Sequence, residues 1–316
     1  MSAAISPDLA RFLGQARDRI EAALPASVPR PPQVPAVLDE AMRYSLLGGG
    51  KRFRPVLALA AADAVARGDE ARITLAVPAA CALECIHTYS LIHDDLPAMD
   101  DDTLRRGRPT SHVVFGEGLA ILAGDGLLSE AFALMAREPT TGDPSLAVRK
   151  LQAIDVVATA AGAIGMVGGQ ALDLDAAGQV RHPDARPTPP FDAASLADMH
   201  ARKTGALIRA AAQVGALMAG GTAHEVDGVA RYATHLGLAF QIVDDILDVE
   251  GEAATLGKTA GKDAAAHKPT YPSLFGLARS RQLAHEALDA ALAALREVDL
   301  GRHLPDLARW VVLRSS

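Results

Sequence analysis

Two groups of aspartates are the residues of this sequence whose types and spacing best suit chemistry. Each group is an adjacent pair followed by a third: Asp94, Asp95 and Asp100 in the first aspartate motif, and Asp244, Asp245 and Asp248 in the second. Carboxylates that lie close together raise one another's pKa values unless a cation lies among them. Because the second motif holds only oxygen donors, it favours Mg²⁺ over zinc. The sequence therefore predicts divalent-cation sites.

The elements around each motif must bring its carboxylates together. In the second motif, helical spacing places the three carboxylates and Gln241 on one side of a helix. In the first motif, the first and third carboxylates would point about 120° apart on a straight helix. Pro97 lies between them and is expected to end or kink that helix. The alternative for the second motif is a solvated acidic edge. For the first motif it is mutual charge neutralisation with the following arginines at a helix end.

Basic residues suited to binding a polyphosphate occur in several other segments. Glycines at 48–50 allow backbone N–H groups to approach phosphate oxygens, and basic residues follow them directly. This run is not a P-loop, because Arg52 stands where that motif requires Ser or Thr. The candidate cations are Lys51, Arg54, Arg105, Arg106, Lys203, Lys258 and Lys268.

Composition predicts an all-α protein. Aromatic residues make up 4% of the chain, and alanine and leucine recur throughout, which favours helices over strands. Several segments, such as 156–169 and 206–219, are apolar almost all round and therefore suit helices enclosed by other helices. No proline-rich break is long enough to require a domain boundary. We expect one domain over residues 1–316, a large helical bundle with a central layer of enclosed helices.

Charge and cysteine content limit the partners and the compartment. The formal net charge is −7, which disfavours binding to nucleic acid or to anionic lipid. Cys81 and Cys85 lie four residues apart in an apolar segment and are expected to be reduced core thiols, which favours a cytoplasmic protein. The longest nearly apolar run, 156–169, is shorter than the roughly 20 residues of a membrane span. We expect neither a signal peptide nor a membrane span.

Seven motifs together resemble the trans-isoprenyl diphosphate synthases, the polyprenyl synthetase family, and within it the bacterial farnesyl diphosphate synthases. The motifs occur in family order along nearly the whole chain: GGGKRFRP, IHTYSLIHDDLPAMDDDTLRRGRPTSH, GGQALDLD, HARKTGALIRAA, FQIVDDILD, TLGKTAGKD and HKPTYP. The resemblance implies the isoprenoid synthase fold, helices around a deep catalytic cavity, and a homodimer. It also implies condensation of isopentenyl diphosphate with an allylic diphosphate, dimethylallyl or geranyl diphosphate.

The resemblance assigns roles to individual residues. The two aspartate motifs would hold three Mg²⁺ ions. The residues that match binders of isopentenyl diphosphate are Lys51, Arg54, His87 and Arg106. Those that match contacts of the allylic diphosphate or the region near it are Arg105, Lys203, Thr204, Gln241, Lys258 and Lys268. Gln170 and Asp173 would belong to a supporting polar network.

Catalysis would consist of ionising the allylic diphosphate. Departure of diphosphate places extra negative charge on the leaving group, which Mg²⁺ and nearby cations would stabilise. The residues expected to act in this step are Asp94, Asp95, Asp100, Arg105, Lys203, Asp244 and Lys258. Tyr89, five residues before the first motif, matches the pattern of members that stop at fifteen carbons, so farnesyl diphosphate is the expected product.

Three alternatives remain open. A geranylgeranyl diphosphate synthase would share the fold and both motifs. An all-helical metal phosphohydrolase would use His93 and Asp94 as an HD dyad, but such a site needs further histidine ligands, which the second motif lacks. A non-catalytic subunit of a heteromeric synthase would typically have lost an aspartate motif, whereas both are intact here.

Overall fold

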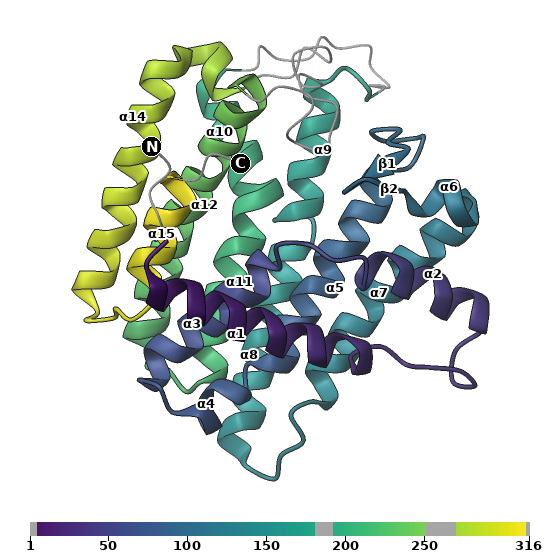
Figure 1. The fold of residues 1–316 in the computed structure, drawn as a ribbon, viewed down its shortest axis with the longest axis horizontal. Coiled ribbons are helices and arrows are strands. Elements are labelled where there is room, and N and C mark those ends of the chain that lie inside the picture. Colours follow the sequence, from purple (N-terminus) through teal and green to yellow (C-terminus); the bar gives the residue numbers. More distant parts are fainter. Residues whose placement is uncertain (1–4, 181–191, 251–269, 314–316) are drawn as a thin grey trace. The chain divides into compact units, whose positions relative to one another are not determined.

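The computed structural model describes residues 5–180, 192–250 and 270–313, and the regular secondary structure of this part is helical apart from one short hairpin (Figure 1). The hairpin pairs β1 (Leu104–Arg105) with β2 (Arg108–Pro109) in antiparallel register. The helices in chain order are α1 (Pro7–Ala23), η1 (Leu24–Ala26), α2 (Ala36–Leu46), α3 (Phe53–Ala66), α4 (Glu70–Thr74), α5 (Val77–Asp94), α6 (Ser111–Phe115), α7 (Glu117–Arg137), α8 (Pro144–Ala161), α9 (Met166–Ala176), α10 (Ala193–His200), η2 (Ala201–Gly205), α11 (Ala206–Met218), α12 (Ala223–Glu250), α14 (Tyr271–Glu297) and α15 (Leu304–Leu313). The prediction of an all-α protein is confirmed.

Local sequence signals explain where several helices begin. The Asp69 side chain accepts hydrogen bonds from the first N–H groups of α4, which otherwise have no partner within the helix. Thr270 and Ser273 form a capping box at the start of α14, where each side chain bonds the other residue's backbone N–H. Helix α5 begins with Pro78 in its first turn, a position that needs no N–H donor.

The chain divides into two compact units. The first-motif unit comprises residues 7–157 and 211–226 and carries the first aspartate motif. The second-motif unit comprises residues 158–210 and 227 onwards, with the N-terminal end of the chain, and carries the second motif. The boundaries fall inside α8, α11 and α12. The single domain expected over 1–316 stays a prediction, and each unit is described by itself.

Helices α3 and α5 form much of the core of the first-motif unit. Nearly every residue of α3 from Pro55 to Ala66 is buried, as expected for a helix that is apolar all round. Helix α5 packs against α3 and along α7. On α11, Gly215 lies directly against the backbone carbonyl of Ala58, where a Cβ would overlap. The close approach of these two backbones therefore requires glycine at 215.

Glycines also set the packing of the second-motif unit. Gly169 on α9 lies against the backbone of Lys203, and Gly237 on α12 lies against Gly205, with a built Cβ only 3.1 Å from the Gly205 Cα. The η2 segment therefore packs closely against both helices. Elsewhere in this unit, the buried Tyr232 hydroxyl donates a hydrogen bond of 2.8 Å to the Leu304 carbonyl, which joins α12 to α15.

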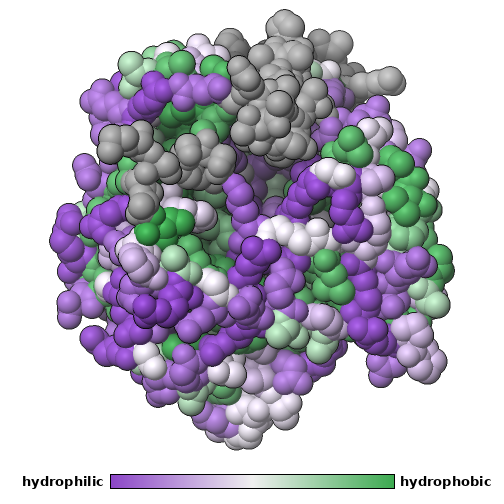
Figure 2. All heavy atoms as spheres, in the orientation of Figure 1, coloured by the Kyte–Doolittle hydropathy of each residue, from purple (hydrophilic) through white to green (hydrophobic). Residues whose placement is uncertain are grey.

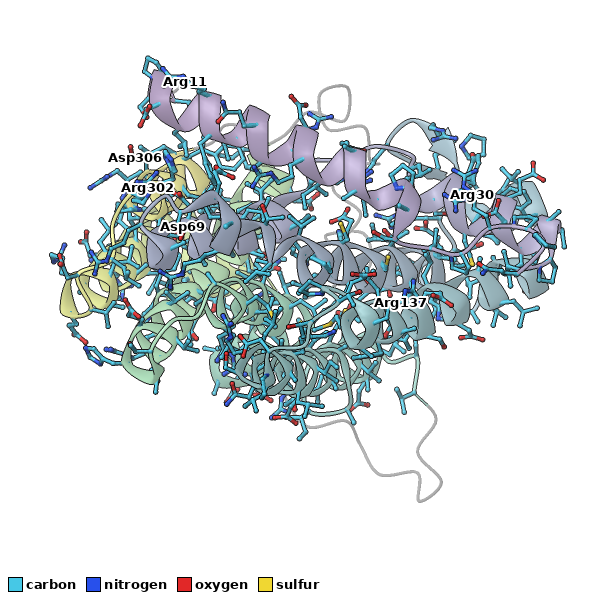
Figure 3. The ribbon with its side chains drawn as sticks, turned by 90° about the horizontal axis from the view of Figure 1, so that it is seen from below. Arg11, Arg30, Asp69, Arg137, Arg302 and Asp306 are labelled. Atoms are coloured by element: carbon cyan, nitrogen blue, oxygen red, sulfur yellow. The ribbon has the colours of Figure 1, made fainter. Side chains whose placement is uncertain are left out.

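Both cysteines are free and buried on α5, which confirms the prediction of reduced core thiols. Burial raises the pKa of the Cys81 thiol to about 11, so this group is not a thiolate near neutral pH. The outer surface is mainly polar on the face drawn in Figure 2, with smaller apolar areas between the polar ones. Figure 3 shows Arg11 projecting from α1, where it pairs with the exposed Asp8.

Three helical stretches are long and apolar enough to cross a membrane by length and composition alone: Glu70–Asp94, Glu117–Arg137 and Pro144–Ala176. Within their most apolar windows, 67%, 39% and 33% of the residues are buried inside the protein. The length of the longest continuous apolar run does not reveal such stretches, because alanine-rich helices reach a high mean hydropathy even when polar residues interrupt them. The absence of a membrane span stays a prediction.

Two glycine substitutions are expected to have opposite effects on stability. Gly215→Ala forces α11 and α3 apart and should lower the free energy of unfolding by about 1–3 kcal/mol. Gly14→Ala lies in the interior of α1, where a Cβ meets no atom within 4 Å, and should raise it by about 0.5–1 kcal/mol. Denaturant unfolding of both variants and the parent checks this. A Gly215→Ala variant as stable as the parent would contradict the close packing.

Candidate active site

The first aspartate motif lies in a turn that folds back on the end of α5. Helix α5 ends at Asp94, three residues before Pro97. The backbone N–H of Asp100 then donates to the Asp94 carbonyl at 2.9 Å, and that of Asp102 donates to the Asp95 carbonyl at 3.1 Å. The turn thus brings the backbone of the third aspartate back to that of the first, as the position of the proline predicts.

Asp95 and Arg105 form a bidentate ion pair. The Asp95 carboxylate is buried, and it accepts from Arg105 Nε at 2.8 and 2.9 Å and from Arg105 Nη2 at 2.5 Å. Paired hydrogen bonds of this kind fix the guanidinium plane as well as neutralise the charge. The pair therefore anchors β1 to the end of α5. Asp94 and Asp100 lie on the turn next to this pair.

The hairpin places Arg106 over the glycine run. Arg106 and Gly107 form its two-residue turn with φ values of 54° and 72°, as a tight hairpin requires. The Arg106 side chain donates to the Gly49 carbonyl oxygen. A Cβ at Gly50 would lie 2.5 Å from Arg106 Nη1. The glycine run is thus a surface against which this arginine packs, and a side chain at 50 would displace it.

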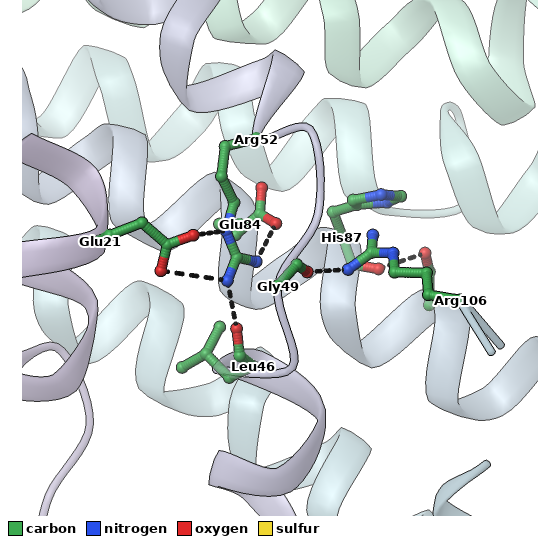
Figure 4. Close-up of polar contacts among 8 residues, drawn as sticks. Glu21, Leu46, Gly49, Arg52, Glu84, His87 and Arg106 are labelled. Carbon is green, nitrogen blue, oxygen red and sulfur yellow. Dashed lines mark hydrogen bonds and ion pairs between the residues drawn. The ribbon is translucent and has the colours of Figure 1, made fainter. Parts of the chain in front are cut away.

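His87 is neutral in this environment. Burial and the nearby charges of Arg54 and Arg106 lower the pKa of His87 well below its usual value. Figure 4 shows His87 beside Arg106 and close to the loop that carries Gly49. Lys51 lies on the same loop and is exposed. The structure therefore gathers the four residues predicted to bind isopentenyl diphosphate, Lys51, Arg54, His87 and Arg106, on one side of the first-motif unit.

Tyr89 lies on α5 and is buried, with 7% of its surface exposed. Its ring meets the imidazole of His93 edge-on at 5.5 Å between centroids. His93 in turn fills the space beside Gly124 on α7, where a Cβ would overlap the imidazole, and its Nε2 lies 3.1 Å from the Ile121 carbonyl oxygen. His93 is therefore a packing residue between two helices, which disfavours the HD dyad of a phosphohydrolase.

Lys203 lies in the η2 segment, a single turn of π-helix between α10 and α11. Its Nζ pairs with a buried carboxylate oxygen of Asp173 at 2.5 Å. Such single π-turns are frequent at functional sites. Burial lowers the pKa of the neighbouring His200 to about 4, so this side chain adds no charge near Lys203. Asp173 thus belongs to a polar network that supports Lys203, as expected from the GGQALDLD segment.

The second aspartate motif lies near the end of α12. Asp244 is exposed and Asp248 is partly buried, whereas Asp245 is buried. The two oxygens of Asp245 accept hydrogen bonds of 2.9 Å from Gln241 Nε2 and from the backbone N–H of Tyr271 at the start of α14. In both motifs, the second aspartate is therefore buried and bound to protein groups.

The residues present fit Mg²⁺ bound together with a phosphate ligand. Among residues 5–180, 192–250 and 270–313, no three carboxylate, histidine or cysteine side chains are gathered into a cage for a metal ion. Mg²⁺ commonly binds through one or two carboxylates and completes its octahedron with substrate phosphates and water. Paired aspartates beside arginine or lysine suit that mode. Lys258 and Lys268, both predicted at the site, lie outside the described residues.

One ion pair near this site was not predicted from the sequence. Arg52 and Glu84 are both buried and bond each other at 2.7 Å. The signal that could have found them is the single glutamate in the otherwise apolar segment 77–86, since a buried charge requires a partner. The sequence does not say which cation that partner is.

Comparison with known proteins gives consistent results. The polyprenyl synthetase family model matches residues 35–300. The chain is 46% identical to geranylgeranyl pyrophosphate synthase 11, chloroplastic, of Arabidopsis thaliana over 311 residues, which is 98% of this chain and 83% of that protein. It is 43% identical to a farnesyl diphosphate synthase of Geobacillus stearothermophilus over 307 residues, which is 96% of this chain and 97% of that protein.

A solved structure supports the same assignment. The FPP/GFPP synthase of Zymomonas mobilis, in its apo form, matches with a TM-score of 0.79 and 37% identity over 96% of this chain and 98% of that one. The predicted isoprenoid synthase fold is thereby confirmed. The family match, the two aspartate motifs and the fold agree with one another. This chain belongs to the polyprenyl synthetase family of trans-prenyltransferases.

Proposed function

We propose that this prenyltransferase condenses isopentenyl diphosphate with geranyl or dimethylallyl diphosphate and releases farnesyl diphosphate as its main product. The observation that carries the condensation is that each unit with an aspartate motif also has a cation held by a carboxylate: Arg105 by Asp95 of the first motif, and Lys203 by Asp173. The observation that favours fifteen carbons is the bulky, buried Tyr89. The second candidate is a geranylgeranyl diphosphate synthase, which one of the relatives is named.

Both aspartate motifs are proposed to act on the same allylic diphosphate. Mg²⁺ bound there would neutralise the charge that develops on the diphosphate as it leaves. The proposed ligands are the six carboxylates of the two motifs, Asp94, Asp95, Asp100, Asp244, Asp245 and Asp248. Asp95 and Asp245 in addition order the backbone or side chains around their motifs.

Cations of the chain assist the same ionisation. Lys203 and Arg105 are proposed to bind oxygens of the leaving diphosphate, and Lys258 and Lys268 are proposed to bind near it. Because carboxylates already hold Lys203 and Arg105 in place, little reorganisation is needed when the charge develops. This ordering before the substrate arrives is what makes such charges effective in catalysis.

The second substrate needs its own anchor. Lys51, Arg54, His87 and Arg106 are proposed to hold isopentenyl diphosphate so that its double bond meets the allylic cation before water does. The neutral His87 would donate an N–H hydrogen bond and add no charge. The released diphosphate is the proposed proton acceptor.

Dipoles next to the allylic cation complete the proposed site. Thr204 directly follows Lys203 in the π-turn. Gln241 donates its amide N–H to Asp245, which leaves the amide oxygen as the end that can face a cation. Both groups would stabilise positive charge without themselves carrying a charge that reacts with it.

A homodimer and a cytoplasmic location are proposed as well. Exposed apolar side chains on α7 and α8 support self-association, since Leu122 and Leu151 are 56% and 68% exposed. Light scattering should give twice the mass of one chain, and the mass of a single chain would contradict the dimer. The two free cysteines support a reducing compartment.

The product assay tests the proposed function. With Mg²⁺, isopentenyl diphosphate and geranyl diphosphate, the protein should release diphosphate and form mainly the fifteen-carbon product. Tyr89→Ala should shift the product to twenty carbons or more, because it removes the bulk of the ring, whereas Tyr89→Phe should not. Chromatography of the dephosphorylated products measures both. A dominant longer product from the parent would contradict the role of Tyr89, and diphosphate release without isopentenyl diphosphate would indicate a hydrolase.

Removal of one carboxylate from either motif should stop turnover. Asp94→Asn and Asp244→Asn are each expected to lower kcat on the order of 10²–10³-fold or more, because the leaving diphosphate loses its metal-held charge. Asp289→Asn changes an exposed aspartate of α14 in the same way and serves as the control. Near-normal turnover in either motif variant, with an unchanged far-UV circular dichroism spectrum, would contradict the metal assignment.

His87 should act as a neutral hydrogen-bond donor. Because its pKa is lowered well below the usual value, the free protein holds it uncharged between pH 6 and 8, and no titration of His87 should appear there. His87→Gln, which keeps an N–H donor, is expected to raise KM for isopentenyl diphosphate less than His87→Leu does. Equal rises in KM for the two variants would contradict the donor role. A KM of the parent that varies with pH between 6 and 8, with that variation lost in His87→Gln, would show that the imidazole titrates.

A further inference from the structure

Arg52 is a buried cation in the middle of the predicted isopentenyl diphosphate residues. Its side chain is fully buried, and its backbone has a left-handed φ of 49° at the N-terminus of α3. Lys51 precedes it and Arg54 follows two residues later. A non-glycine residue in the left-handed region is strained, and it persists only where the surroundings hold it. The contacts of the Arg52 side chain supply that hold.

The Arg52 guanidinium joins three helices (Figure 4). Nε donates to Glu21 on α1 at 2.8 Å, Nη1 donates to Glu84 on α5 at 2.7 Å, and Nη2 donates to the carbonyl of Leu46 at the end of α2 at 2.9 Å. A planar guanidinium that bonds three partners fixes both the position and the direction of the backbone that carries it. These bonds therefore hold the loop at residues 47–52 in a fixed position on α1, α2 and α5.

Glu84, which Arg52 bonds, lies on the same helix as His87. Glu84 precedes His87 by three residues on α5, so both side chains leave nearly the same face of that helix. Glu84 is 2% exposed, and its second oxygen, Oε2, accepts no hydrogen bond from any residue within the described part of the chain. Arg52 is thus the group that neutralises and orients this carboxylate, and Arg106 bonds the same loop from its other side, at Gly49.

We infer that Arg52, through Glu84, is a positioning residue for isopentenyl diphosphate. It would hold Lys51 and Arg54 in register with His87 and Arg106 without touching the substrate itself. This inference rests on the proposed function, because it assumes that these four residues bind that diphosphate. A displacement of about 1 Å in such a constellation is enough to cost a large factor in binding or rate.

The test separates the two substrates. In Arg52→Gln, KM for isopentenyl diphosphate should rise about tenfold or more, while KM for geranyl diphosphate stays within about twofold. Arg52→Lys keeps the charge but not the planar set of donors and should fall between Arg52→Gln and the parent. The matched control is Arg43→Gln, because Arg43 is also nearly buried and holds three carbonyl groups and Asp39. It should lower the melting temperature and leave both KM values unchanged.

A double variant separates positioning from stability. Arg52→Gln leaves Glu84 as a buried, unpaired charge, which destabilises the fold. Arg52→Gln with Glu84→Gln removes both charges and should regain much of the melting temperature, yet KM for isopentenyl diphosphate should remain raised. Recovery of a parental KM in the double variant would overturn the inference, as would equal changes in KM for both substrates in Arg52→Gln.

Calorimetry distinguishes this inference from the proposed function. Direct titration with isopentenyl diphosphate should show about tenfold weaker binding to Arg52→Gln than to the parent and to Arg43→Gln. If the parent binds isopentenyl diphosphate but transfers no prenyl group, the proposed function is wrong and the inference stands on the binding data. If the parent transfers a prenyl group and Arg52→Gln binds as tightly as the parent does, the inference alone is wrong.

Discussion

A cation that binds diphosphate must be held in place before the diphosphate arrives, and buried carboxylates provide that hold here. Asp95 orients Arg105, and Asp173 pairs with Lys203. Glu84 pairs with Arg52, which is inferred to position the neighbouring cations and not to bind the diphosphate itself. Without such partners, the cations would repel one another or point into solvent. Ordering them would then lower the free energy gained on substrate binding. The same pairs keep the buried carboxylates from being unpaired charges, so neither partner is tolerated alone.

Close backbone packing allows these pairs to form. Gly50 lies where any side chain would meet the Arg106 guanidinium, and Gly169 lies where any side chain would meet the backbone of Lys203. The glycines of GGGKRFRP and GGQALDLD therefore have a steric role that is distinct from phosphate contact. The glycine loop at residues 48–50, whose sequence suits a phosphate-binding turn, is therefore also the surface against which Arg106 packs.

The sequence predicted the helices, both aspartate motifs and the turn at Pro97, because these follow from local periodicity and from the chemistry of proline. It did not predict that Asp95 and Asp245 bind protein groups, because an adjacent pair of carboxylates looks symmetrical until the helix faces are known. The pairing of Arg52 with Glu84 joins residues 32 positions apart, and no local rule selects it. The π-turn at Lys203 likewise depends on packing of its backbone against Gly169.

The account depends most on both aspartate motifs acting on one diphosphate. A crystal structure with Mg²⁺ and an unreactive thiolo analogue of geranyl diphosphate tests this most directly. The account predicts oxygens of Asp94, Asp100 and Asp244 at about 2.1 Å from Mg²⁺ ions that share a single diphosphate, with Lys203 and Arg105 beside it. A diphosphate held by one motif only, with no metal at the other, would contradict it.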